Sequence, residues 1–179
     1  MDAVAGTAIA PAVQIKALDN LGNLVKTFTG TTVTVGLAAN PGGGTLSGTV
    51  SKPAAAGVVS FSDLAINRTG TGYTLTADAT GLTGATSAAF AISAAAATRL
   101  VFSQQPTSVV AGAAISPAVT VTALDASDNV ATGFTGSVTV ALGGNPGSGT
   151  LSGTTSAPVT QRSSFAQWFK SSCSVLVSS

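Results

Sequence analysis

Apolar and polar residues alternate with a period of two along most of this chain. Val13, Ile15 and Ala17, for example, are separated by the polar residues Gln14 and Lys16. No segment places apolar residues at helical spacing over three turns, so the pattern predicts strands with one solvent-facing side. The clearest alternating segments are 13–17, 32–37, 58–62, 73–78 and 90–92.

Short glycine-, asparagine- and aspartate-rich stretches separate these segments, and such stretches favour turns. They are 19–23 (DNLGN), 40–44 (NPGGG), 69–72 (TGTG) and 81–84 (GLTG). About seven short strands at this spacing predict an all-β fold, an antiparallel β-sandwich.

The sequence repeats itself at a spacing of one whole domain. Ala5–Gly30 returns as Ala111–Gly136, and Val33–Thr49 returns as Val138–Thr154. A period of roughly 100 residues is longer than that of solenoid repeats and matches the size of a domain. We therefore interpret the chain as part of a tandem array.

The repeat divides the chain into unit one, residues 1–97, and unit two, residues 98–160. Unit two opens with Thr98–Pro106 (TRLVFSQQP), which reads as a first strand, and no such segment precedes Ala5. We expect unit one to lack its first strand, which would leave an unpaired sheet edge. One hypothesis is that Thr98–Pro106 folds back to complete unit one.

Residues 161–179 form an aberrant tail, because the repeat ends at about Gln161. This tail holds the only Trp, the only Cys and two of the seven Phe. A shift of one nucleotide allows residues 162–172 to be encoded as GVASLNGLSV, which resembles Gly57–Ile66 (GVVSFSDLAI) at the expected offset. We predict a frameshift that leaves unit two incomplete and less stable than unit one. A divergent capping segment is the alternative.

Low charge sets limits on the partners of the chain. Charged residues make up 7% of the sequence and the net charge is +1, whereas about 25% is usual in globular proteins. Scattered basic residues argue against nucleic acid as a partner.

The longest apolar run, Ala88–Ala97, is too short to span a bilayer, so we expect no membrane insertion. Met1 lies almost directly on repeat sequence, so we expect no signal peptide and a chain cut from a longer protein.

The sequence contains few residues that could act as catalytic acids or bases. The chain contains no His and no Glu, so acid–base chemistry would depend on six Asp residues. Ser and Thr are abundant, but no base is available to activate them. We predict that the protein is not an enzyme and needs no cofactor.

The two aspartate-rich turns are the only candidate metal sites. Asp19 and Asn23 in one turn, and Asp125 and Asp128 in its repeat, could offer oxygen ligands to calcium. Calcium takes six to eight oxygens, and one turn supplies about three. The alternative is that each Asp caps its own turn through the backbone, and we favour this alternative.

The repeat as a whole resembles bacterial immunoglobulin-like repeats of the invasin and intimin type. The resemblance rests on TRLVFSQQP, AVTVTALDASDN, NPGSGTLSGT, GVVSFSDLAI and GTGYTLTA. It implies tandem Ig-like sandwiches, with Tyr73 at a tyrosine-corner position whose hydroxyl bonds to nearby backbone. The Cys–Trp–Cys arrangement of antibody domains is absent.

The resemblance also implies a structural role. It points to a spacer or stalk module of an extracellular or surface-anchored bacterial protein, of the adhesin kind. The partners would be neighbouring repeats, with any host or surface ligand bound elsewhere in the longer protein. The alternatives are a carbohydrate- or protein-binding module and a phage decoration domain.

Overall fold

The computed structural model describes residues 2–159 and the backbone of residues 175–176. Over these residues the protein is all-β, with several small antiparallel sheets and no helix. The chain divides into two compact units, Met1–Ala95 and Ala96–Ser179, and the names unit one and unit two refer to these from here on. No helix in the described part is long and apolar enough to cross a membrane.

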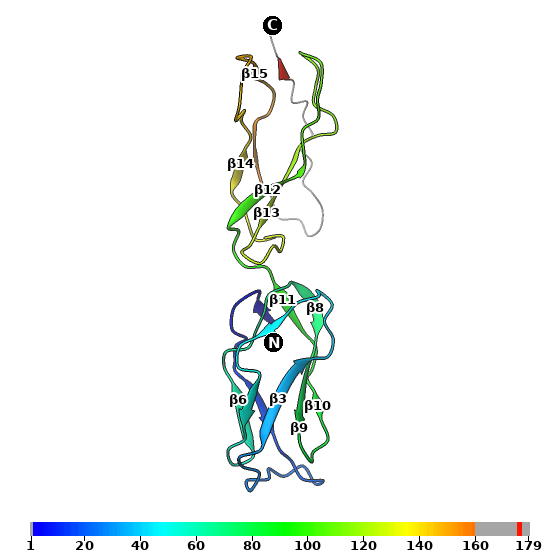
Figure 1. The fold of residues 1–179 in the computed structure, drawn as a ribbon, viewed down its shortest axis with the longest axis vertical. Coiled ribbons are helices and arrows are strands. Elements are labelled where there is room, and N and C mark those ends of the chain that lie inside the picture. Colours follow the sequence, from blue (N-terminus) through cyan, green and yellow to red (C-terminus); the bar gives the residue numbers. More distant parts are fainter. Residues whose placement is uncertain (1, 160–174, 177–179) are drawn as a thin grey trace. The chain divides into compact units, whose positions relative to one another are not determined.

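Unit one contains four sheets among its described residues (Figure 1). The largest has the strand order β10-β9-β3-β5, the second has the order β1-β11-β8, and the other two are the pairs β2–β6 and β4–β7. The strands are β1 (Asp2–Val4), β2 (Val13–Lys16), β3 (Thr32–Leu37), β4 (Leu46–Ser47), β5 (Ser51–Pro53), β6 (Val58–Phe61), β7 (Ala65–Ile66), β8 (Gly70–Tyr73), β9 (Leu75–Ala79), β10 (Ala85–Thr86) and β11 (Phe90–Ser93).

The alternating segments of unit one form strands, as predicted, except that segment 73–78 is divided at Thr74 between β8 and β9, and one predicted turn is wrong. The TGTG stretch was expected to be a turn, yet Gly70–Tyr73 is strand β8, which pairs with β11. Pairing with a neighbouring strand overrides the local turn preference of glycine. The turn between β9 and β10 lies where the GLTG signal begins, and there the Leu82 amide donates to the Ala79 carbonyl at 3.2 Å.

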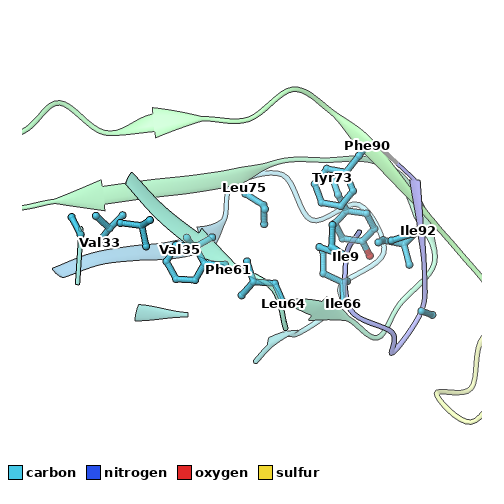
Figure 2. Packing of buried hydrophobic residues seen from close by; sticks show 14 residues of the cluster. Ile9, Val33, Val35, Phe61, Leu64, Ile66, Tyr73, Leu75, Phe90 and Ile92 are labelled. Carbon is cyan, nitrogen blue, oxygen red and sulfur yellow. The ribbon is translucent and has the colours of Figure 1, made fainter. Parts of the chain in front are cut away.

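The core of unit one collects side chains from several sheets (Figure 2). Strand β3 alternates regularly, with Val33 and Val35 buried and Thr32 and Thr34 exposed. Phe61 on β6 and Leu75 on β9 join the same cluster. Burying each large apolar side chain contributes about 1.5–3 kcal/mol. The side chains that are most completely buried are Ile9, Phe61, Leu64, Ile66 and Tyr73.

The first and last strands of unit one pair with each other in parallel. Asp2, Ala3 and Val4 of β1 lie opposite Ala91, Ile92 and Ser93 of β11. Strand β1 has only three residues, so the alternation pattern does not reveal it. Unit one thus begins with strand β1. This strand pairs with β11, whereas β2, the next strand along the chain, pairs with β6.

Unit two has three strand pairs in its described part, β12–β13, β14–β16 and β15–β17. Strand β12 pairs with β13 inside unit two, so the hypothesis that Thr98–Pro106 folds back onto unit one is wrong. The strands are β12 (Arg99–Gln104), β13 (Thr120–Leu124), β14 (Ser137–Thr139), β15 (Thr150–Leu151), β16 (Ser156–Pro158) and β17 (Val175–Leu176).

Burial differs sharply between the two units. Among the buried apolar residues of the described chain, only Ala131 and Val138 belong to unit two. The frameshift predicted for residues 161–179 falls outside the described residues, apart from the backbone pairing of β17 with β15.

Candidate functional site

The turn at Asp19 is held by the Asp19 carboxylate. Its Oδ1 accepts hydrogen bonds from the backbone amides of Leu21 at 2.9 Å and Asn23 at 2.8 Å, and its Oδ2 accepts one from Asn23 Nδ2 at 3.1 Å. The Asp19 amide in turn donates to the Asn23 carbonyl. The side chain thus bonds to two backbone amides of the turn, which is the geometry of an Asx-type turn.

Unit two has the same Asx-type turn at Asp125. Asp125 Oδ1 accepts from the amides of Ser127 at 2.8 Å and Asn129 at 2.9 Å, and Oδ2 accepts from Asn129 Nδ2 at 2.9 Å. The Asp125 side chain is fully buried. Burying a carboxylate is costly unless hydrogen bonds satisfy it, and the turn supplies these bonds.

The calcium candidates have specific partners in the structure. Asp19 and Asn23 bond to each other, whereas Asp128, the residue with φ of 63°, pairs with Arg99 on β12. Asp125 and Asp128 therefore direct their carboxylates at different partners. No group of three or more His, Cys, Asp or Glu side chains suited to a metal ion occurs within the described residues.

Hydrogen bonding lowers the pKa of the Asp19 carboxyl below its ordinary value. The largest cause is the hydrogen bond from the Asn23 backbone amide, followed by that from the Asn23 side chain. These donors favour the charged form of Asp19, which keeps the turn in place at neutral pH.

Tyr73 is buried in the core of unit one and hydrogen-bonds to the backbone that precedes β8. Its hydroxyl donates to the Arg68 carbonyl at 3.0 Å, a backbone group five residues upstream, and its ring packs 6.1 Å from that of Phe90. A Cβ added at Gly42 would collide with the Tyr73 hydroxyl and the Thr69 carbonyl. The NPGGG loop therefore approaches Tyr73 so closely that Gly42 cannot carry a side chain.

Asparagine closes the same loop in both units. Asn40 exchanges two hydrogen bonds with the backbone of Gly44, both at 2.8 Å, and Asn145 does the same with Gly149 at 2.7 Å. The two units therefore share local structure at this loop as well as at the aspartate turn.

A further aspartate, Asp63, makes a contact that sequence reasoning did not find. Its Oδ2 accepts hydrogen bonds from the Thr49 amide at 2.9 Å and the Thr49 hydroxyl at 2.7 Å. The bond from the Thr49 side chain is the largest cause of the lowered pKa of Asp63. Fourteen residues separate the two partners, so no local pattern indicates the pair.

At all of these positions except Asp128, which pairs with the Arg99 side chain, the aspartate, asparagine or tyrosine side chain hydrogen-bonds to backbone of its own unit. What they do together is to fix turns and loops around an apolar core. Comparison with known protein families, with curated proteins and with solved structures gave no match to this chain.

Proposed function

We propose that each unit is an Ig-like β-sandwich and that the chain is a spacer or stalk module of an extracellular bacterial repeat protein, of the adhesin kind. The single observation that carries this proposal is the parallel pairing of β1 with β11 in unit one. The domain-scale repeat and the turns common to both units support it. The Ig-like assignment rests on the resemblance, on the strand pattern and on the buried Tyr73 with its backbone bond to Arg68.

A parallel pair of terminal strands suits a module that carries tension. Asp2 lies opposite Ala91, and Val4 lies opposite Ser93. An outward pull on the two ends of unit one would draw β1 and β11 in opposite directions along their length. The evenly spaced bonds of a parallel pair would then be loaded together rather than opened one by one.

Further bonds reinforce this strand pair. The Ala5 amide donates to the Ser93 carbonyl at 2.8 Å, and the Ser93 hydroxyl donates to the Ala3 carbonyl at 3.2 Å. The Ala91 amide donates to Asp2 Oδ1 at 3.2 Å. Backbone and side chains together connect the first strand of unit one to the last.

Buried aromatic rings favour this role over that of a carbohydrate-binding module. A carbohydrate platform needs exposed rings, but Phe61, Tyr73 and Phe90 of unit one are buried in its core, and the exposed Phe102 of unit two is a single ring. The alternative is a phage decoration domain, and the identity of the neighbouring genes would distinguish it from a stalk module.

The proposal is tested by stretching the full chain between handles at its two ends. We expect unit one, Met1–Ala95, to unfold in one event that releases about 30 nm of chain. Replacing Ala5 by proline removes the amide that bonds to Ser93, so Ala5→Pro should lower the unfolding force.

Val4→Pro is the matched control. Since the Ala5 amide points at β11, the alternation of peptide groups points the Val4 amide away from it. Equal unfolding forces for the natural chain and Ala5→Pro, or gradual extension of unit one without a force peak, would contradict a role in resisting tension.

A further inference from the structure

The edges of two sheets of unit one meet where β5 is followed by β6. Strand β5 is the outer strand of the four-stranded sheet, and β6 pairs with β2 on its other edge. Apart from the single bridge between Ala55 and Val58, no described strand pairs with either strand on this side. Such an edge is a template on which another chain can add a strand.

The outer edge of β5 carries a proline. Across the β3–β5 pair the Ala54 amide donates to the Thr31 carbonyl, so the peptide groups of Ser51 and Pro53 face away from β3. Pro53 has no N–H, and the edge therefore offers one donor fewer to an added strand. Unit two has proline at the equivalent position, Pro158 in β16.

The Lys52 side chain occupies the neighbouring edge of β6. The Gly57 carbonyl accepts a hydrogen bond from the Ala17 amide, so the peptide group of Ser60, three residues farther on, faces away from β2. Lys52 Nζ donates to the Ser60 carbonyl at 3.0 Å. A strand added to β6 would compete with Lys52 for this carbonyl.

Lys52 leaves β5 on the core side of the sheet. It lies directly opposite the buried Val33, and directly opposed residues share one face. Its Nζ is 5.9 Å from the centre of the Phe61 ring, which belongs to the same core as Val33 (Figure 2). An inward-pointing charge at a sheet edge opposes pairing, because an added strand would remove the ammonium from water.

The repeat shows that this register accepts an apolar residue. The equivalent of Lys52 is Ala157 of β16, which lies opposite Val138 as Lys52 lies opposite Val33. The chain has 7% charged residues and a net charge of +1, so overall charge repulsion between copies is weak. Protection of an edge therefore depends on local features such as Lys52.

We propose that Lys52 protects this side of unit one against strand addition by a second copy of the chain. Its ammonium occupies the Ser60 carbonyl and places a positive charge between the edges of β5 and β6. An apolar side chain on the core side of β5 would serve packing better than a lysine. The lysine thus favours specificity over stability.

The first test replaces Lys52 in the full chain and measures self-association by sedimentation over a range of concentrations. Lys52→Met keeps the length of the side chain and removes its charge, and it should associate at an at least about tenfold lower concentration than the natural chain. Lys52→Arg keeps the charge and should behave like the natural chain. Lys26→Met is the matched control, because Lys26 is an exposed lysine of unit one outside the strands.

Urea unfolding of the same variants separates edge protection from a structural role. We expect the unfolding midpoint of unit one in Lys52→Met to be no lower than in the natural chain. A lowered midpoint without association would make Lys52 a stabilising residue and overturn the proposal. Equal association of the natural chain, Lys52→Met and Lys26→Met would also overturn it.

Lys52→Gln is a second variant, which keeps a donor for the Ser60 carbonyl and should also associate. If neither Lys52→Met nor Lys52→Gln folds, Lys52 is required for the fold and the proposal is wrong. Amide exchange of the associated chains locates the contact. The amides of Ser51 and Ser60 should gain protection, whereas that of Gln14 on the far edge of β2 should not. Protection at Gln14 alone would overturn the proposed edge.

Discussion

At the scale of single residues, polar side chains in this protein mostly hydrogen-bond to backbone nearby. Asp19 and Asp125 each hold a turn, and Asn40 and Asn145 each close a loop. The sequence predicts the two aspartate turns, because an Asx turn is made within about four residues. It does not predict the bond between Asp63 and Thr49, because the folding of distant segments brings these partners together.

Tyr73→Phe should destabilise unit one by about 1 kcal/mol, because it removes the hydrogen bond to the Arg68 carbonyl and keeps the buried ring. Tyr73→Ala should cost more, about 3–5 kcal/mol, since it also leaves a cavity in the core. Urea unfolding of both variants measures the difference. A Tyr73→Phe chain with an unchanged unfolding midpoint would show that the hydroxyl contributes nothing.

Acid should weaken unit one through Asp19 and Asp63. Both carboxyls have a pKa below the ordinary value of 3.8 in the folded protein. A lowered folded pKa stabilises the protein above the unfolded pKa, and this stability is lost as pH falls through the folded pKa. The unfolding midpoint should therefore decline below about pH 4.

The matched variant for this prediction is Asp19→Asn with Asp63→Asn, whose amide oxygens can still accept hydrogen bonds but do not titrate. Its unfolding midpoint, measured by urea at pH 5 and at pH 2.5 to frame this window, should change less than that of the natural chain. The same decline in both chains would assign the acid sensitivity to other groups.

At the scale of strands, alternation finds the strands that line the core, but not which strands pair. The burial of Val33 and Val35 follows directly from the pattern. The pairing of β1 with β11, and of β8 with the same strand, depends on contacts across about 90 and 20 residues, respectively. Such long-range pairing is decided by packing of the whole unit, so period-two alternation carries no signal for it.

Gly48 joins two strands at a point where only glycine fits. Its φ is +97°, and an added Cβ would collide with the Asp63 carbonyl. Gly48→Ala should destabilise unit one by about 3 kcal/mol or more, from backbone strain together with the collision. Thermal unfolding gives the measurement.

Gly81→Ala is the control for Gly48, because Gly81 has a similar φ of +81° and open space around it. It should cost only the conformational strain, about 1–2 kcal/mol. Equal losses for the two variants would mean that the contact with Asp63 does not matter.

At the scale of the whole molecule, the two units have similar sequences over the repeated segments but differ in their cores. Unit one buries apolar side chains from β3, β6, β9 and β11, whereas the described part of unit two buries Ala131 and Val138. The sequence predicts this inequality from the point at which the repeat ends, near Gln161. The number and length of the small sheets follow from side-chain packing, which the repeat does not reveal.

Hydrogen exchange of the full chain should separate the two units. Amides of β2 and β3 should exchange at least about tenfold more slowly than those of β13 and β14, their equivalents in the repeat, because more apolar burial holds unit one together. Comparing equivalent segments of the repeat controls for local sequence. Equal protection in both units would contradict a less stable unit two.

The central claim is that this chain is a module of a longer extracellular repeat array. The most direct measurement is the sequence of the encoding DNA, read through the codons for residues 161–179 and well beyond both ends. We predict a frame that, once corrected, reads GVASLNGLSV and continues into further repeats, together with a signal peptide and an anchor. An intact frame, with no repeat, signal peptide or anchor in the flanking DNA, would contradict the account.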